Sequence, residues 1–354
     1  MNNHDGRGAQ LALNNRFSKL SHEPRADFLN YCENEKESFR HKKTIYKEVY
    51  PKTIINKITS PDVGMQYSMN PYQGCEHGCV YCYARNSHEF WGYGPGLDFE
   101  SRIMVKKNSS KLLEDKIRKK SWQACTIVMS GNTDCYQPAE KSFKITRSCL
   151  EVFLKYKHPV GIITKNALIL RDIDLLRSLN KNGLIAVHIS ITTLSEKTRR
   201  LLEPRTASIK KRLNTVKKLS ELGIPVNVML APIIPSINSH EILAMAKAAS
   251  EAGAISVGHT MVRLNGSIGL LFYDWIKKRM PDRANKVMRQ IEACHGGNLN
   301  DSRFGVRMRG EGKIAEQIND TIKIAKRKYF TGKKMPVLNT ELHHLHKNDQ
   351  LRLF

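Results

Sequence analysis

The sequence predicts an α/β fold, a partial barrel of six β/α units, and three observations support this prediction. Short apolar runs alternate along the chain with amphipathic helical patterns. The runs are almost continuously apolar, as strands buried on both faces of a parallel sheet are. Several helical patterns end in glycine, at Gly183, Gly223 and Gly253, which is a common helix stop signal. Six units fit a partial barrel better than a closed eightfold one.

The expected elements follow one another along the middle of the chain. In barrels of this kind the functional side chains lie at the C-terminal ends of the strands, so the residues after each strand are the first candidates for a site. The expected strands are 66–70, 124–130, 160–164, 184–190, 225–231 and 254–260, and the expected helices are 141–156, 168–180, 208–222 and 239–251.

Composition divides the rest of the chain. Residues 1–60 are polar and basic, which predicts an arm that wraps around the domain or stays mobile. Residues 61–265 form the barrel domain, residues 266–330 a basic helical extension, and residues 331–354 a flexible tail. The chain has neither an apolar run long enough to span a membrane nor the apolar core of a secretory signal, so we expect a cytoplasmic protein.

The charge balance points to a partner. The chain carries 58 Lys and Arg residues against 33 Asp and Glu residues, a formal net charge of +25. An excess of this size favours a polyanionic partner, usually nucleic acid, although a generally basic proteome gives the same balance. In a reducing cytoplasm, clustered thiols indicate metal ligands or catalytic groups rather than disulfides.

Three of the eight cysteines, Cys75, Cys79 and Cys82, lie in the stretch GCEHGCVYCYAR, directly after the first expected strand. Thiolates are soft ligands that select zinc, copper(I) or iron–sulfur clusters. A structural zinc site needs four ligands, whereas three thiolates on a [4Fe–4S] cluster leave one iron open to bind a cofactor. The side chains considered as a fourth zinc ligand are His77, His88, Cys125, Cys135, Cys149 and Cys294.

The spacing CxxxCxxC, with the aromatic Tyr81 before the last cysteine, resembles the signature of the radical S-adenosylmethionine (SAM) superfamily. The resemblance implies a TIM-like partial (β/α)6 barrel of the radical SAM type. It also implies a [4Fe–4S] cluster on Cys75, Cys79 and Cys82, SAM bound at the open iron, and an external electron donor. One electron then cleaves SAM to a 5′-deoxyadenosyl radical, while the protein supplies positioning and electrostatics.

Within the superfamily, the barrel resembles spore photoproduct lyase and its bacterial relatives. The likeness extends from Asn70 to Pro235, and residues 266–354 add nothing to it. The matching stretches are NPYQGCEHGCVYCYAR, GNTDCYQPAE, IITKN, SITT with LEPRT, and VMLAPIIP.

The resemblance gives SAM-binding roles to residues at the strand ends. The turn SGNTD would hold the SAM amino group, although an ordinary strand-end turn with an Asx cap explains the same residues. Lys165 would bind the SAM carboxylate as a point charge, unless it is a lysine that extends along the surface. Ser190 would contact the methionyl group and Ala231 the adenine. The SAM-binding candidates are Tyr81, Ser130, Gly131, Asn132, Thr133, Lys165, Ser190 and Ala231.

Further candidates would act in the radical chemistry itself. Tyr83, after the last cysteine, matches a lyase tyrosine near the radical path, or it is a core aromatic that covers the cluster. Glu203 and Arg205, in LEPRT, would form an ion pair with each other or face the ribose and the substrate.

The hydrogen donor is where the chain departs from the lyase family. That family has a cysteine at the position of Gly131, which puts the lyase reaction itself in question but not another radical reaction on a related substrate. Cys135 is the candidate catalytic thiol of this chain, and Cys125 lies at the start of the same strand. The alternative for either cysteine is a plain buried thiol, which is the usual state of a free cysteine.

The chain ends in QLRLF, which resembles the QLxLF peptide that docks bacterial replication and repair proteins on the sliding clamp. An extended peptide with a glutamine and a Leu–Phe pair fits an apolar pocket with one polar anchor. The predicted clamp-binding residues are Gln350, Leu351, Leu353 and Phe354.

Together these features predict a radical SAM enzyme that acts on nucleic acid, with DNA lesion repair or base modification as the leading interpretation. An extruded or unpaired nucleotide would enter the barrel, because a radical formed inside cannot reach a stacked base. Two alternatives stay open. One is a radical SAM enzyme that modifies RNA or protein, and the other is a non-enzymatic iron–sulfur protein that binds nucleic acid and has a fourth protein ligand.

Overall fold

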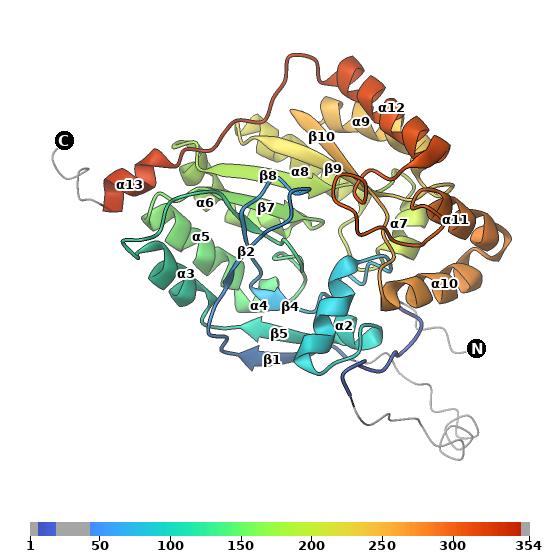
Figure 1. The fold of residues 1–354 in the computed structure, drawn as a ribbon. Helices are drawn as coiled ribbons and strands as arrows, with labels where there is room; N and C mark the ends of the chain where they lie inside the picture. Colours follow the sequence, from blue (N-terminus) through green and yellow to red (C-terminus); the bar gives the residue numbers. More distant parts are fainter. Residues whose placement is uncertain (1–5, 19–42, 348–354) are drawn as a thin grey trace.

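The structure, a computed structural model, describes residues 6–18 and 43–347 (Figure 1). Its centre is a seven-stranded sheet in the order β10-β9-β8-β7-β6-β3-β2. Six of these strands run parallel and coincide with the six expected ones, so the predicted fold class is confirmed. The seventh, β2, is antiparallel to β3 and comes from the predicted arm. The strands are β2 (Ile55–Lys57), β3 (Tyr67–Met69), β6 (Ile127–Met129), β7 (Val160–Thr164), β8 (Ile185–Ser190), β9 (Val226–Ile233) and β10 (Ser256–Met261).

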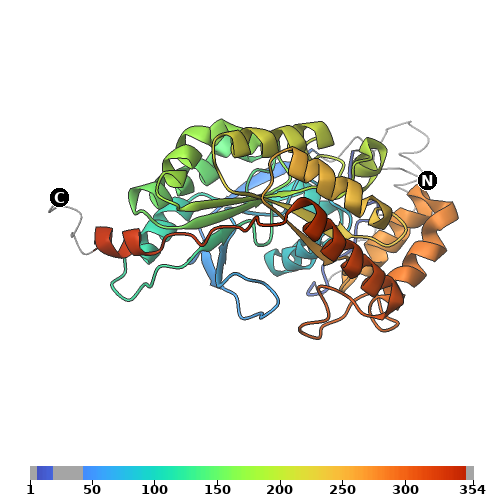
Figure 2. The same cartoon turned by 90° about the horizontal axis from the view of Figure 1, so that it is seen from above.

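Helices connect the parallel strands, and Figure 2 shows the longer ones side by side along one face of the sheet. The expected helix 141–156 is divided in two, because Lys144 has a φ of 52° and ends α4 before α5 begins. Ser208 caps α8 by accepting a hydrogen bond from Lys211 N. The connecting helices are α4 (Glu140–Phe143), α5 (Ile145–Lys155), η2 (Ala167–Asp172), α6 (Ile173–Asn180), α7 (Glu196–Leu202), α8 (Ile209–Glu221), η3 (Ser239–Glu241) and α9 (Ile242–Glu251).

The parallel register brings the strand ends together. Thr164 pairs with Ile189, and Ser190 pairs with Met229, so the residues that follow neighbouring strands meet at one end of the barrel. We call this end, at the C-terminal ends of the parallel strands, the barrel mouth. Apolar side chains of the sheet and the helices fill the main core below it.

A second, three-stranded sheet in the order β1-β5-β4 leads into the segment with the clustered cysteines. β1 comes from the predicted arm and pairs parallel with β5, and β4 pairs antiparallel with β5. The elements of this region are β1 (Ile45–Val49), β4 (Tyr72–Gln73), η1 (Tyr83–Trp91), α2 (Leu97–Ser101), β5 (Arg102–Lys106) and α3 (Ser109–Ile117).

The first described segment, residues 6–18, packs against the cysteine segment. Residues 7–10 are buried there, and Gly8 N donates to Glu100 Oε2 at 3.0 Å. A Cβ at Gly8 would lie 1.7 Å from the carbonyl oxygen of Gly78, so only glycine fits. This part of the predicted arm therefore wraps against the domain.

The C-terminal extension is helical, as expected. α12 packs on α9, and Ser250 Oγ donates to Tyr329 O at 3.0 Å. The predicted tail contains a further helix, α13, and Asn339 N donates to Gly183 O at 2.9 Å. Within the described residues, no helix is both long and apolar enough to cross a membrane. The helices of this region are α10 (Ser267–Arg279), α11 (Pro281–Ala293), α12 (Gly312–Tyr329) and α13 (Glu341–Lys347).

Candidate active site

Three cysteines lie on one loop between β4 and η1, residues 74–82, which we call the cysteine loop. The seven cysteines that the structure describes are all free, and Cys75 and Cys79 are buried. Cys75 N donates to Phe99 O at 2.8 Å, and Cys82 N donates to Cys79 O at 3.3 Å. Backbone hydrogen bonds therefore fix a loop that presents three reduced thiols.

A buried ion pair supports one side of the cysteine loop. Arg85 Nε donates to Cys79 O at 3.0 Å, and Arg85 Nη2 donates to Glu100 Oε1 at 2.5 Å. Gly78 has a φ of 67°, and a Cβ there would lie 2.7 Å from Glu100 Oε2. The carboxylate thus lies directly against the loop backbone, a position that only glycine allows.

The described residues do not form a site for a single metal ion here. No group of three or more His, Cys, Asp or Glu side chains among them, the three cysteines included, is placed to hold one ion. His77 Nδ1 lies 3.3 Å from Asp134 Oδ2, and His77 Nε2 lies 3.3 Å from Asn166 Nδ2, so both ring nitrogens have protein partners. The ring of His88 packs between two aromatic rings. A closed zinc site needs four converging ligands, whereas an iron–sulfur cubane takes each thiolate on a different iron.

Burial raises the pKa of all three thiols. The carboxylate of Asp134 adds to this effect at Cys75, and the guanidinium of Arg85 opposes it at Cys82. A bound metal ion reverses such a shift, because a coordinating thiol loses its proton. The loop therefore suits a soft metal centre better than a reactive free thiolate.

Asp134 lies in the turn after β6, and its side chain accepts hydrogen bonds from residues at the end of β7. Its Oδ1 accepts a hydrogen bond from Thr164 Oγ1 at 2.8 Å, and its Oδ2 accepts one from Lys165 N at 2.8 Å. Burial alone would raise the pKa of Asp134, but His77 and the Lys165 N–H hold it below its usual range. The ionised carboxylate fixes the backbone of Lys165 beside the cysteine loop.

The turn after β6 carries four predicted SAM-binding residues, and the N–H groups of Ser130, Asn132 and Thr133 already have partners. Ser130 has a φ of 72°, and its Oγ accepts a hydrogen bond from Cys135 N at 2.7 Å. Asn70 Oδ1 accepts hydrogen bonds from Asn132 N at 2.8 Å and Thr133 N at 3.3 Å. An ammonium group donates hydrogen bonds, so only the oxygen atoms of this turn are suited to hold one.

Gly131 is enclosed in this turn. Its carbonyl oxygen accepts a hydrogen bond from Tyr83 OH and keeps a second lone pair. A Cβ at position 131 would lie 2.7 Å from the Cβ of Ser68. The packing of β3 against this turn therefore closes the position where the lyase family has its cysteine.

Glu203 is a fully buried carboxylate on the other side of the cysteine loop. Its Oε1 accepts hydrogen bonds from Tyr81 OH and from Thr192 Oγ1, the latter at 2.6 Å. Arg212 Nη2 donates to Oε2 at 2.5 Å, and Lys165 Nζ lies 3.8 Å from Oε1. Burial alone would raise the pKa of Glu203, but Arg212 and Lys165 outweigh it and lower the pKa to about 2. Glu203 is therefore ionised at neutral pH, and it holds Tyr81 in place.

The ion pair expected between Glu203 and Arg205 does not form. Arg212, from the first turn of α8, takes that place, and Arg205 Nη1 lies 3.9 Å from Glu76 Oε1 instead. The reason is the path of the LEPRT segment. Arg199 donates to its backbone carbonyls, and the segment turns so that the side chain of Glu203 is buried while that of Arg205 is exposed.

The remaining candidates divide between the mouth and the interior. Lys165 follows β7, Ser190 is the last residue of β8, and Ala231 lies near the end of β9. Tyr83 is 51% exposed. Cys135 is fully buried behind the turn after β6. The clamp-binding candidates Gln350, Leu351, Leu353 and Phe354 lie outside the described residues.

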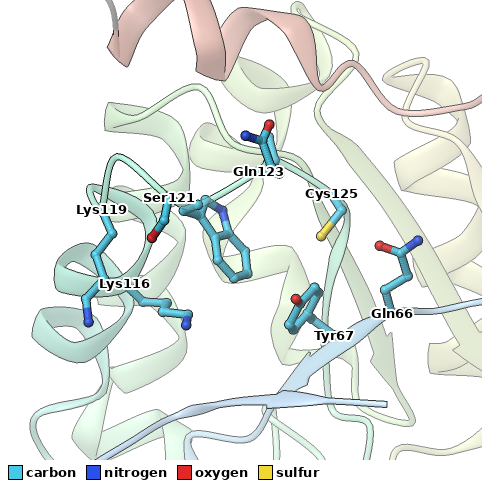
Figure 3. Close-up of a pocket in the computed structure, with 9 residues that line it drawn as sticks. Gln66, Tyr67, Lys116, Lys119, Ser121, Gln123 and Cys125 are labelled. Carbon is cyan, nitrogen blue, oxygen red and sulfur yellow. The ribbon is translucent and has the colours of Figure 1, made fainter. Parts of the chain in front are cut away.

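Cys125 lies at the opposite end of the barrel, before β6 begins. It lines a cavity of about 310 Å³ (Figure 3). Lys116 extends over the ring of Trp122, 5.3 Å from its centroid, and Tyr67 packs on the same ring. Cys125 lies at the N-terminal ends of the strands, whereas the cysteine loop lies at their C-terminal ends, so this thiol is separated from the other three.

Sequence reasoning missed residues that shape the site. Asn70 and Asp134 lie within or beside the matching stretches, so their positions at strand ends were a usable signal. Arg212 lies on the buried side of α8, where a charged residue predicts a buried partner. Gly8 and Glu100 gave no signal, because their partners are distant in sequence.

Comparison with known proteins agrees with this geometry. The sequence model described as Radical SAM superfamily matches residues 69–249, about half of the chain. An uncharacterized protein of Mycobacterium bovis is 28% identical over 247 residues, which are 68% of this chain and 72% of that protein. An uncharacterized protein of Methanocaldococcus jannaschii is 34% identical over 190 residues, 54% of this chain and 68% of that protein.

Solved structures share the fold. A single-residue variant of spore photoproduct lyase has a TM-score of 0.61 at 16% identity, with 90% of this chain and 86% of that chain covered. A second variant of that enzyme, with bound AdoMet and dinucleoside spore photoproduct, has a TM-score of 0.60 at 15% identity and coverages of 89% and 86%. At such identities the likeness shows a common architecture.

Proposed function

The chain belongs to the radical SAM superfamily and is a radical SAM enzyme, and on this premise we propose that it uses a [4Fe–4S] cluster and SAM to modify nucleic acid, in DNA lesion repair or base modification. One observation carries the proposal. The cysteine loop presents three free thiols, Cys75, Cys79 and Cys82, within the stretch that the Radical SAM superfamily model matches.

The residues of the cysteine loop fit an iron–sulfur cluster. Cys75, Cys79 and Cys82 would hold it, because a set of thiolates is what such clusters select. Lys165 opposes the rise in the pKa of Cys79, and Arg85 and Lys165 oppose it at Cys82. When bound, the cluster and SAM supply a one-electron cleavage of SAM, for which an external electron donor is required.

Lys165 would bind the carboxylate of SAM. Its ammonium is 3.8 Å from Glu203 and its side chain is 16% exposed, so it can turn toward a ligand while Arg212 continues to neutralise Glu203. The free lone pairs of the turn after β6 would accept hydrogen bonds from the SAM amino group. Ser190 and Ala231, on the next two strands, would contact the methionyl group and the adenine.

Three observations support a nucleic-acid substrate. The formal net charge is +25. The fold is similar to that of spore photoproduct lyase, one structure of which contains a dinucleoside spore photoproduct. The half-exposed ring of Tyr83, next to the last cysteine, offers a surface on which an extruded base can stack. We expect such an enzyme in the reducing cytoplasm.

The closed position of Gly131 supports a reaction that differs from the lyase reaction. A cysteine side chain there would collide with Ser68, and the thiol of Cys135 is buried away from the mouth. Tyr83, whose hydroxyl donates to the carbonyl of Gly131, is the exposed candidate for returning a hydrogen atom to the substrate.

The test is a SAM-cleavage assay on protein reconstituted anaerobically with iron and sulfide and reduced with dithionite. We expect 5′-deoxyadenosine from the wild type and a loss of more than about 100-fold in Cys82→Ala. Cys125→Ala is the matched control and keeps the activity, because this thiol lies at the other end of the barrel. A cluster whose spectrum does not respond to SAM would favour the non-enzymatic alternative.

The substrate is tested in the same assay with single-stranded DNA, duplex DNA carrying photoproducts, tRNA and protein extract. Stimulation of SAM cleavage and a modified nucleotide with DNA are the expected result. Stimulation by tRNA or protein alone would favour the alternative in which the enzyme modifies RNA or protein.

A further inference from the structure

Loops far apart in the sequence join the two edges of the main sheet. The loop between β2 and β3 carries Asp62, and the loop between α11 and α12, which bonds to the end of β10, carries Arg307 (Figure 1). Gly305 N donates to Asp62 Oδ1 at 2.6 Å, and Arg307 Nε donates to Asp62 Oδ2. We call this contact the side clasp. The two edge strands of the sheet, β10 and β2, are not hydrogen bonded to each other, so the partial barrel has an open side. The side clasp connects the loops next to these edge strands by an ion pair.

Arg263 lies near both the side clasp and Tyr83, the residue after the last cysteine. It follows β10 between two buried residues whose N–H groups are both hydrogen bonded. Its partly buried guanidinium is within electrostatic range of Arg307 and Asp62, and also of Tyr83. Among the described residues, no hydrogen-bond acceptor and no carboxylate pairs with it.

The lack of a protein partner distinguishes Arg263 from the buried arginines of this domain. Arg85, Arg199 and Arg212 each donate to carbonyl or carboxylate oxygens. Burial lowers the pKa of Arg263, and the nearby charge of Arg307 lowers it further. An anion near both guanidinium groups would stabilise the charged form of each.

Exposed aromatic rings accompany these two cations. The guanidinium of Arg307 lies over the ring of Phe304, 4.5 Å from its centroid, and Phe304 is 59% exposed. The half-exposed side chain of Tyr83 lies near Arg263 as well. Proteins that bind single-stranded nucleic acid combine basic groups for the backbone with aromatic rings for the bases. A planar guanidinium also matches the paired oxygens of a phosphate.

We propose that Arg263 and Arg307 bind a backbone phosphate of the nucleic-acid substrate, while Tyr83 and Phe304 stack on neighbouring bases. The inference rests on the proposed function and names the residues that hold its substrate. Without substrate, Asp62 neutralises Arg307, and the incoming phosphate takes the place of this carboxylate.

The experiment measures the binding of a fluorescein-labelled single-stranded oligonucleotide to the reconstituted protein by anisotropy, at several salt concentrations. Arg263→Gln raises Kd about tenfold, because a charge-assisted hydrogen bond is lost. It also reduces the slope of log Kd against log salt by about 0.7, which corresponds to one phosphate contact. Asp62→Asn frees Arg307 and lowers Kd about threefold. Arg177→Gln, at an exposed position on α6, leaves Kd unchanged.

Cluster absorbance verifies that each variant contains the iron–sulfur cluster, and thermal unfolding verifies that it is folded. Arg263→Lys keeps the positive charge but not the planar guanidinium, so we expect a Kd between those of the wild type and Arg263→Gln. Equal oligonucleotide affinity in the wild type and Arg263→Gln would overturn the inference and leave the proposed function standing. A loss of SAM affinity in place of oligonucleotide affinity would assign Arg263 to the cofactor and overturn it as well. A wild type that binds no oligonucleotide would overturn the proposed substrate itself.

Discussion

Two fully buried carboxylates lie on opposite sides of the cysteine loop, and they differ in what neutralises them. Glu100 accepts hydrogen bonds from Gly8 N at 3.0 Å and Ala9 N at 2.8 Å, and Arg85 donates to it at 2.5 Å. All of these partners are fixed, two by the backbone and one by complete burial. The Glu100 side of the loop is therefore rigid.

Glu203, in contrast, is neutralised entirely by side chains, and one of them is held loosely. Arg212 donates to Glu203 at 2.5 Å, whereas Lys165 stays 3.8 Å away and is partly exposed. The Glu203 side can therefore give one partner to a ligand without leaving its own charge unpaired. The two carboxylates are equally buried and differ in the accessibility of their partners, so Glu203 is the one of the two that we expect to respond to a ligand.

Replacing Glu100 has the largest expected effect. Glu100→Gln leaves the guanidinium of Arg85 buried without a carboxylate, which lowers the free energy of unfolding by about 3–5 kcal/mol. Urea unfolding measures this change. Glu114→Gln breaks a surface pair with Lys155 and serves as the control, with a loss below about 1 kcal/mol. Equal losses in the two variants would remove the basis of the comparison.

The pH dependence of stability tests the other carboxylate. Because the pKa of Glu203 is lowered from 4.5 to about 2 on folding, its ionised form stabilises the protein above pH 4.5. The shift corresponds to about 3 kcal/mol, which is lost as the pH falls toward 2. Glu203→Gln removes this contribution, so the difference in free energy of unfolding between wild type and variant should shrink over that window. A difference that does not change with pH would contradict the assignment.

The contact of the N-terminal segment with the cysteine loop gives a smaller effect. Gly8→Ala places a Cβ 1.7 Å from the carbonyl oxygen of Gly78, so the segment must shift. We expect a loss of about 1–3 kcal/mol in the free energy of unfolding and faster removal of the cluster by a chelator. Gly64→Ala, whose Cβ meets nothing within 4 Å, is the matched control. Identical chelation rates would show that the segment does not protect the loop.

The smallest change in stability is expected at Lys165. Lys165→Met removes a loosely held partner of Glu203, so the free energy of unfolding changes by less than about 1 kcal/mol. The affinity for SAM, measured by equilibrium dialysis, should fall about tenfold. Lys141→Met, at an exposed position of α4, should change neither quantity. A large loss of stability without a loss of SAM affinity would make Lys165 a structural residue.

The parts of the fold that the sequence predicted are those with local signals. The parallel strands are short, mostly apolar runs, and the cysteine triplet is a single motif, so both could be recognised without knowing distant contacts. The Glu203–Arg212 pair could not, because Arg205 is nearer in sequence and only the turn of the backbone shows that it points elsewhere. The docking of residues 6–18 was equally hidden, since it depends on backbone groups that bond to Glu100.

The contact between Gly8 and Gly78 has a consequence for the order of assembly. During synthesis Gly8 leaves the ribosome long before Gly78 and Glu100 exist, and until then the segment has nothing to bind. This early segment can therefore reach its place at the loop only after residue 100 has been made. Until the N-terminal segment docks, the peptide carbonyl of Gly78 is exposed to water. In the folded protein the segment around Gly8 covers this carbonyl.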